Sequence, residues 1–197
     1  DSATYDEVEL KGTIVDISTE FSVQKPAVSP FHTAGVMINR KASTLKVMPV
    51  YDGKRVNLSD ILIDENEVPK EFFIDETTLD KWKYMKGGKK EERVTKLGHK
   101  YFYSEGPMAF PDALDRPSRT IVTGEGGTTA SRFKHVVLTP SGRYRRLTPL
   151  ELERLDMFPD NHTSLGGVRD VTRAFIAGNA LVVGVIQRFG EVLAKRA

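Results

Sequence analysis

The sequence predicts an α+β fold in which short strands precede helices. Three observations predict it. Residues 44–50 alternate apolar and polar side chains, as a half-buried strand does. Residues 148–158 carry the start and stop signals of a capped helix, and residues 181–193 carry a broad apolar stripe at helical spacing. Short strands followed by helices are typical of this class.

The first thirty residues are weakly patterned. A strand is predicted at residues 13–17, and Pro26 and Pro30 predict a loop after it. Two further strands are predicted at residues 35–39 and 44–50, on either side of a polar turn. Residues 58–63 form either a short helix or a strand.

The middle of the chain begins with a helix predicted over residues 75–85, which stops at Gly87-Gly88. A long segment rich in glycine and proline follows, and only residues 101–103 in it have strand character. Loops this long inside a compact protein are usually functional. Strands are then predicted at residues 121–123 and 133–138, before a turn at residues 140–142.

The next helix has the clearest local signals in the chain. Thr148 suits the N-cap, Pro149 suits the first helical position, and Glu151 completes a capping box. Three arginines flank or lie on this helix, namely Arg145, Arg146 and Arg154. A helix start beside concentrated positive charge suits a phosphate, and the alternative is an ordinary surface helix. After a loop at Gly166-Gly167, Asn179 is the predicted cap of a final helix that reaches about Lys195.

Composition excludes several classes. Of the 197 residues, 39% are hydrophobic and 28% charged, which is ordinary for a globular protein. No apolar run approaches the roughly 20 residues of a membrane span, and the N-terminus is not of secretory type, so no membrane partner is expected. The chain has no cysteine, which excludes disulfides and cysteine nucleophiles and fits a reducing compartment. The four histidines have no metal-like spacing, so no metal is expected.

The net charge of +2 hides a segregation of charges. Residues 60–80 are acidic, residues 81–100 are basic, and basic residues gather again between residues 132 and 146. Two basic stretches in a nearly neutral chain indicate one positive face, the usual surface for a polyanion. The alternative is two solvated loops.

Three blocks of the last hundred residues resemble DNA (cytosine-5)-methyltransferases of the bacterial restriction–modification type. Residues 145–159 resemble the family's ninth motif, an arginine–leucine–threonine–proline–glutamate run that ends in phenylalanine–proline. Residues 178–183 resemble the tenth motif, which opens the last helix. Residues 86–127 resemble the target recognition domain. The resemblance implies a small, mostly-β recognition domain, followed by C-terminal helices that complete a Rossmann-like α/β methyltransferase domain.

The chain also departs from that family. The reaction needs a cysteine thiolate that attacks C6 of cytosine, so that C5 accepts the methyl group of S-adenosylmethionine. This sequence has neither the cysteine, nor the family's glycine-rich cofactor turn, nor its arginine-rich eighth motif. The resemblance therefore implies the C-terminal piece alone, with a catalytic partner segment or subunit elsewhere. Its predicted parts are an N-terminal β-containing region (1–74), a recognition region (75–144) and a C-terminal helical region (145–197).

The resemblance implies roles for particular residues. The DNA-reading loops would contain Lys86, Gly87, Gly88, Lys89 and Arg93, and then Thr123, Gly124, Glu125, Gly126 and Gly127. Arginine and lysine suit guanine, and glutamate can accept from cytosine N4. The phosphate-binding candidates are Thr120, Arg132, Lys134, Arg145 and Arg146. Asn179 and Ala180 would approach the cofactor. The alternative is that the glycines only form turns, the charges are solvated, and Asn179 only caps its helix.

The leading interpretation is therefore the recognition and C-terminal part of a cytosine-5 methyltransferase that acts on double-stranded DNA in the bacterial cytoplasm. This chain alone is expected to be inactive. It also predicts that the apolar stripe of residues 181–193 is exposed in the isolated chain. The rivals are a stand-alone DNA-binding module, which would bind DNA in a salt-dependent way without methyl transfer, and a plain interaction domain.

Overall fold

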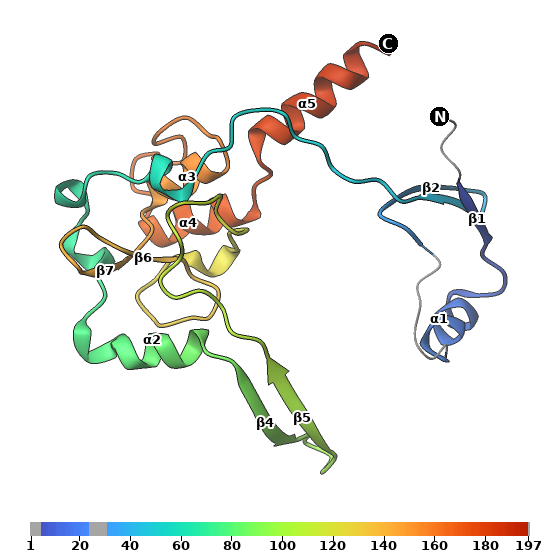
Figure 1. Cartoon of the computed structure of the whole chain (residues 1–197), viewed down its shortest axis with the longest axis horizontal. Coiled ribbons are helices and arrows are strands. Elements are labelled where there is room, and N and C mark those ends of the chain that lie inside the picture. The colour runs from blue at the N-terminus through green and yellow to red at the C-terminus, as the bar shows by residue number, and fades with distance from the viewer. Residues whose placement is uncertain (1–4, 24–30, 197) are drawn as a thin grey trace. The chain divides into compact units, whose positions relative to one another are not determined.

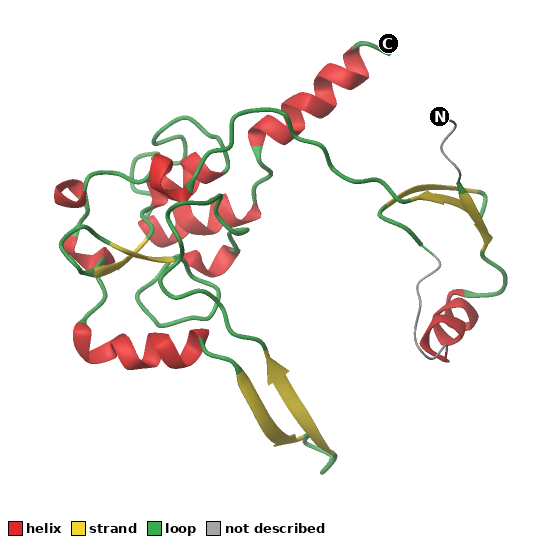
Figure 2. Ribbon diagram, viewed as in Figure 1, coloured by secondary structure: helices red, strands yellow, loops and turns green. Residues whose placement is uncertain are grey.

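The computed structural model describes residues 5–23 and 31–196, and the chain divides into two compact units, Asp1–Lys54 and Arg55–Ala197 (Figure 1). Both units combine helices with small antiparallel sheets, which agrees with the mixed α and β content that the sequence predicts (Figure 2). The second unit starts at residue 55, so residues 55–74 pack with the segments that follow them. The predicted boundaries at residues 74 and 144 stay a prediction.

The N-terminal unit holds a three-stranded antiparallel sheet in the order β1-β3-β2. Its elements are β1 (Asp6–Glu9), α1 (Ile14–Val23), β2 (Ala34–Ile38) and β3 (Lys41–Leu45). Asn39 and Arg40 join β2 to β3 with φ angles of 48° and 66°. Such paired positive angles belong to the tight turns that match the twist of a hairpin.

Two predictions for this unit are wrong. Residues 13–17 begin a helix, because the Thr13 N–H donates to Asp16 Oδ2 at 2.7 Å while the Asp16 N–H donates to Thr13 Oγ1 at 3.2 Å. This reciprocal cap outweighs the strand preference of the β-branched residues after it. The strand predicted at residues 44–50 ends at Leu45, because the tight turn starts β3 already at Lys41. The loop predicted around Pro26 and Pro30 lies outside the described residues.

The C-terminal unit is built from short helices and two hairpins. Its 3-10 helices are Leu58–Ile61, Glu65–Glu67, Lys70–Phe72, Glu76–Thr78 and Thr123–Glu125. Its α-helices are α2 (Leu79–Lys86), α3 (Pro149–Leu155), α4 (Asp170–Asn179) and α5 (Val183–Ala194). Its hairpins pair β4 (Lys89–Val94) with β5 (Lys100–Glu105), and β6 (Val136–Leu138) with β7 (Tyr144–Arg146). In Figure 1 the β4–β5 hairpin and α5 both extend away from the body of the unit.

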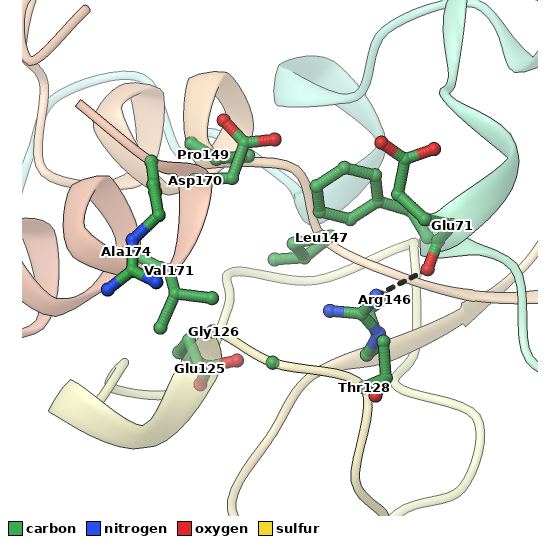
Figure 3. A pocket seen from close by; sticks show the side chains of 13 residues that line it. Glu71, Glu125, Gly126, Thr128, Arg146, Leu147, Pro149, Asp170, Val171 and Ala174 are labelled. Carbon is green, nitrogen blue, oxygen red and sulfur yellow. Dashed lines mark hydrogen bonds between the residues drawn. The ribbon is translucent and has the colours of Figure 1, made fainter. Parts of the chain in front are cut away.

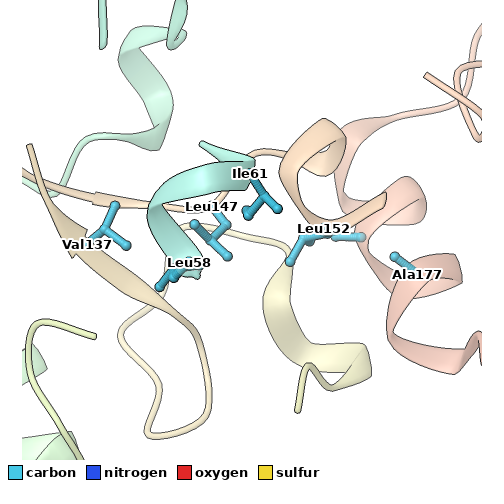
Figure 4. Packing of buried hydrophobic residues seen from close by; sticks show 7 residues of the cluster. Leu58, Ile61, Val137, Leu147, Leu152 and Ala177 are labelled. Carbon is cyan, nitrogen blue, oxygen red and sulfur yellow. The ribbon is translucent and has the colours of Figure 1, made fainter. Parts of the chain in front are cut away.

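The core of this unit lies where the first 3-10 helix, β6, α3 and α4 meet (Figure 4). The chain segments that form it are far apart in sequence. Its buried members are Leu58, Ile61, Val137, Leu147, Leu152, Ala174 and Ala177. Removing apolar surface from water stabilises a fold by roughly 25 cal/mol per Å². Burial of this cluster therefore stabilises the packing of the helices against the small sheet.

Several predictions for this unit agree with the structure. The helix expected over residues 75–85 forms as a 3-10 turn followed by α2, and Gly87 is its C-cap. Residues 101–103 lie inside β5, and residues 58–61 form a 3-10 helix. The capped helix is α3, with Thr148 as N-cap, Pro149 at its start and the full capping box formed with Glu151.

Other predictions need correction. The strand expected at residues 121–123 is not formed, and the strand expected at residues 133–138 is limited to β6. The sequence also missed α4, and it missed β4 because that strand is mostly charged. Asn179 does not cap the last helix. It is the last residue of α4, its side chain donates to the Phe175 carbonyl at 2.9 Å, and Val182 occupies the N-cap of α5.

The stretch Asp170–Ala194 is long and apolar enough to cross a membrane, by length and composition only. It is not an uninterrupted apolar run, because it contains Asp170, Arg173, Arg188 and Glu191. The stretch is divided at residues 180–182 into α4 and α5. Ala174 and Ala177 of α4 lie in the core, while α5 has no buried residue.

Candidate nucleic-acid interface

The β4–β5 hairpin carries basic side chains on an exposed ribbon. Lys90, Lys96 and Lys100 are exposed, and at the tip Leu97 is 97% exposed. Lys100 pairs with Glu92 at 2.9 Å, and no ion pair joins Lys90 or Lys96 to any residue that the structure describes. A two-stranded ribbon of this kind fits the major groove of duplex DNA.

The base of the hairpin is braced by two of the predicted DNA contacts. Arg132 donates to the Glu105 carboxylate at 3.2 Å and to the carbonyl oxygens of Gly106 and Gly87. Lys89 lies 3.7 Å from the same carboxylate, with its ammonium 4.6 Å from the ring centroid of Tyr84. Both side chains are mostly buried, so their charges hold the hairpin to the body of the unit.

Arg93 stands further along the hairpin and remains exposed. Its guanidinium lies 3.5 Å from the ring centroid of Tyr103 and 3.2 Å from a Glu91 carboxylate oxygen. Stacking on an aromatic ring holds the guanidinium in a fixed plane. Of the basic residues predicted to read bases, Arg93 is the one that the structure presents to solvent.

Glu125, predicted to read cytosine, instead lies inside the protein and is 3% exposed. One carboxylate oxygen accepts the backbone N–H of His135 at 2.9 Å, and the other lies 2.8 Å from His135 Nδ1. The opposite ring nitrogen lies 2.9 Å from the Ser118 hydroxyl. Glu125 therefore links residues 123–129, the glycine-containing loop, to His135 just before β6. Its carboxylate is too buried to contact a base.

Two predicted lysines are buried beside this network. Lys134 donates to the carbonyl oxygens of Gly127 and Thr129 at 3.1 and 2.8 Å, and burial lowers its pKa. Lys86, at the end of α2, donates to the Lys134 carbonyl, and burial lowers its pKa to about 8. Lys134 thus binds the backbone of the loop, and Lys86 binds the backbone of Lys134. In this arrangement neither reaches a phosphate or a base.

The segment between these anchors is exposed where the sequence predicts contact. Thr120, Thr123 and Gly124 face solvent. Just before them, Arg119 donates to Asp112 Oδ1 at 2.9 Å, and the other oxygen of Asp112 accepts the Val136 N–H at 2.8 Å. The segment is therefore anchored at both ends. Arg119 is linked through Asp112 to Val136 of β6, and Glu125 is linked to His135.

The glycines of this region have different roles. A Cβ on Gly126 would lie 3.0 Å from the Val171 Cα, and Gly127 has a φ of 80°, which favours glycine. Gly124 meets no atom within 4 Å and therefore leaves open space around the backbone. Gly87 and Gly88 join α2 to β4. The predicted close approach of glycine backbone to DNA therefore fits Gly124, whereas Gly126 and Gly127 are explained by packing and by backbone conformation.

Arg145 is 2% exposed and is paired with Glu151 through two hydrogen bonds of 2.7 and 2.8 Å. Glu151 also accepts the Thr148 N–H at 2.7 Å, so a carboxylate already occupies the start of α3. The expectation that this helix start binds a phosphate is therefore wrong. Arg145 has no surface for DNA, whereas Arg146 points into a cleft (Figure 3).

Asn179 and Ala180 form the junction between α4 and α5. Neither residue lines the cleft beside Arg146. Asn179 is exposed, and its amide nitrogen is engaged by the Phe175 carbonyl. One exposed amide without an enclosing wall does not form a nucleoside site, so a cofactor held here would need most of its contacts from residues outside this chain.

The apolar face of α5 is exposed, as the sequence analysis expects. Phe189 is 63% exposed and Leu193 67% exposed, and the helix is anchored mainly at its first turn. There the Val183 N–H donates to the Asp156 carbonyl at 2.9 Å. A Cβ on Gly184 would lie 2.6 Å from the Met157 sulfur, so the anchor is tight.

Sequence reasoning missed the buried residues that anchor the segment of residues 119–125. Asp112, Ser118 and His135 carried no motif, and their role depends on partners between 7 and 24 residues away in the chain. A polar residue within an apolar run, such as His135 before Val136-Val137, was the one signal that could have indicated a buried hydrogen-bonded group. Among the residues that the structure describes, no cluster of three or more potential metal ligands occurs.

Comparisons with known proteins give consistent matches. Residues 7–195 match the family model of C-5 cytosine-specific DNA methylases. The chain is 42% identical over 182 residues to the Type II methyltransferase M.Sau3AI of Staphylococcus aureus, a match that covers 92% of this chain and 41% of that protein. The structure of the Entamoeba histolytica methyltransferase EhMeth has a similar fold, with a TM-score of 0.50 and 16% identity over 79% of this chain and 47% of that one. The chain thus spans less than half the length of either protein.

Proposed function

The chain belongs to the family of C-5 cytosine-specific DNA methylases, and from that premise we propose that it is the target-recognition and C-terminal part of such an enzyme. The complete enzyme would transfer a methyl group from S-adenosylmethionine to C5 of a cytosine that is flipped out of a specific duplex sequence. The nucleophilic cysteine and most of the cofactor site would lie on another segment or on a partner chain. Without a cysteine, this chain by itself would not catalyse the reaction.

The observation that carries the proposal is the exposed apolar face of α5. Its exposed members are Val183, Val185, Ile186, Phe189, Val192 and Leu193, and Leu181 just before the helix is exposed as well. A stripe this long on a soluble domain marks a surface that another protein segment covers. Docking of this face on the catalytic part would complete the Rossmann-like domain.

In this proposal the recognition unit contacts DNA through two exposed regions. The β4–β5 hairpin would place Arg93 and the exposed lysines of the ribbon in the major groove. The segment with Thr120, Thr123 and Gly124 would contact the backbone near the flipped nucleotide. The buried Glu125 and Lys134 and the partly buried Arg132 would hold these regions to the body of the unit through their internal hydrogen bonds.

Mixing this chain with a catalytic part tests the proposal. The partner is the portion of the Staphylococcus aureus methyltransferase outside the region that this chain matches. Labelled methyl groups should enter duplex DNA only in the mixture. Phe189→Asp on the apolar face should abolish transfer, while Lys195→Asp, beyond the last turn of α5, should not.

The control experiment is a duplex-binding titration with this chain alone at low salt. Binding without transfer in any mixture would favour a stand-alone DNA-binding module. If neither binding nor transfer occurs, a plain interaction domain becomes the better description.

A further inference from the structure

A cleft of about 200 Å³ opens between the glycine-containing loop, the end of β7 and the start of α4 (Figure 3). Gly126, Gly127 and Thr128 form one side, and Val171 and Ala174 of α4 form another. The volume corresponds to several water molecules, at about 30 Å³ each. It is large enough for a single tetrahedral oxyanion.

The guanidinium of Arg146 points into this cleft. The residue is 5% exposed, donates to the Glu71 carbonyl oxygen, and lies with its guanidinium carbon 5.0 Å from the ring centroid of Phe72. Among the residues that the structure describes, no carboxylate forms an ion pair with it. Arg145, the residue before it, is by contrast fully paired with Glu151.

Burying the Arg146 guanidinium is costly, because its charge has left water and the charge of Glu71 acts on it without a direct ion pair. Burial accordingly lowers the pKa of Arg146. An anion that entered the cleft would supply the missing partner, and the guanidinium fork matches two oxygens of a phosphate. The Glu71 charge and carbonyl offset part of this cost, and an anion in the cleft would offset more of it.

The surroundings of Arg146 favour an anion as well. Arg169 stands at the start of α4 and adds a second positive charge to the lining. Of the acids in the lining, Asp170 lies 3.8 Å from Arg173, and Glu125 is bound to His135. Glu71 meets Arg146 through its backbone carbonyl, and in Figure 3 its carboxylate points away from the guanidinium.

We propose that the cleft beside Arg146 binds one phosphate group of the DNA backbone. This inference rests on the proposed DNA-binding function and adds a specific anchor to it. Because Gly126–Thr128 lines the cleft and follows directly after Thr123 and Gly124, a phosphate held there would place the duplex in a defined register against that segment. Such a contact positions the DNA without reading its sequence.

The salt dependence of duplex binding by the full chain tests this anchor. The slope of log K against log salt concentration falls by about 0.9 in magnitude for each phosphate contact that is lost. Arg146→Gln removes the charge, and Val171→Trp fills the cleft but leaves Arg146 in place. Thr172→Trp is the matched control, because Thr172 is exposed on the same helix and does not line the cleft.

We expect both cleft variants to bind the duplex about tenfold more weakly and to lose about 0.9 of the slope. Thr172→Trp should behave as the wild type. Because Arg146→Gln can destabilise the fold, the Val171→Trp result decides. If the wild type binds DNA and the salt slope of Val171→Trp equals that of the wild type, the phosphate anchor is overturned while the proposed function still stands.

A second arm covers a chain that binds no duplex, which would count against the proposed function itself. Inorganic phosphate is then titrated while the backbone amide resonances of Gly126, Gly127 and Thr128 are followed by NMR. Shifts that vanish in Val171→Trp would show an anion site whose ligand is not DNA, and would thus contradict the assignment to a backbone phosphate. The absence of any shift would exclude an anion site of any kind.

Discussion

Replacing Glu151 by glutamine removes the charge at the centre of the buried network that holds α3. Glu151 is fully buried, and its carboxylate accepts hydrogen bonds from Arg145, from the Thr148 backbone and side chain, and from the Ile63 N–H at 3.0 Å. The Ile63 bond links the first core segment to α3 across 88 residues. The variant therefore perturbs the cap, the ion pair and this link together.

The magnitude follows from the ion pair. Removal of one partner of a buried pair costs about 3–5 kcal/mol, since the other charge stays buried and unpaired. The introduced glutamine would still accept one hydrogen bond through its amide oxygen, but its amide nitrogen would face the Arg145 guanidinium, donor against donor. Among the described residues, Arg145 Nε already lacks a hydrogen-bond partner, so the guanidinium has few acceptors to turn towards. We expect the free energy of unfolding to fall by about 3–5 kcal/mol.

Urea unfolding followed by circular dichroism measures the change. Glu191→Gln on exposed α5, where the Glu191 carboxylate accepts from the Gln187 side chain at 3.0 Å, is the matched control and should stay within about 0.5 kcal/mol. Replacing both Arg145 and Glu151 by methionine should cost less than the sum of the single losses, because neither charge is then left unpaired. A loss below about 1 kcal/mol in Glu151→Gln, or strictly additive single losses, would refute the reasoning.

Three further outcomes are expected. Gly178→Ala places a Cβ 2.5 Å from the Thr123 backbone nitrogen, so it should lower the free energy of unfolding in urea by about 1–3 kcal/mol. The amide resonance of Thr123 should shift in the same variant, and an unshifted resonance would contradict the close packing. Glu125→Gln should lower stability by about 1–3 kcal/mol in urea, because it weakens the buried contact with His135, and an unchanged urea midpoint would contradict that contact. Burial raises the pKa of Asp156 to about 6 from 3.8, so the folded state binds this proton more tightly than the unfolded state, and the contribution of Asp156 to stability should fall by up to about 3 kcal/mol as pH rises from about 4 to 6. Urea unfolding across this range should therefore show the stability of wild type falling relative to that of Asp156→Asn as pH rises, and a constant difference between the two would contradict a raised pKa of Asp156.

Local signals were read correctly where the deciding interactions are local. The α3 cap depends on Thr148, Pro149 and Glu151, which lie within four residues, and α2 ends at a glycine that directly follows it. The errors occur where distant partners decide. Residues 121–123 have strand-like composition, but they pack beside α4 where Gly178 leaves no room for a side chain, and no neighbouring strand among the described residues pairs with them.

The candidate site shows the same division. The exposed positions Arg93, Thr120 and Thr123 agree with their predicted accessibility, and their contact with DNA stays a prediction. Glu125 was misread, because a carboxylate beside three glycines has the same sequence signature whether it faces a base or a buried histidine. Only the 2.8 Å approach of His135 separates the two cases.

The sequence by itself determined the family, the lack of a nucleophilic cysteine and the helix cap, since each follows from residue types and short spacings. The tertiary structure alone decided which charges face solvent. Arg145 and Arg146 are adjacent and chemically identical, yet one is neutralised by Glu151 and the other lies buried at a cleft without a carboxylate partner among the described residues. The physical reason is that the cost of a buried charge depends on the partners that folding brings within a few ångströms, and those partners lie far away in the chain.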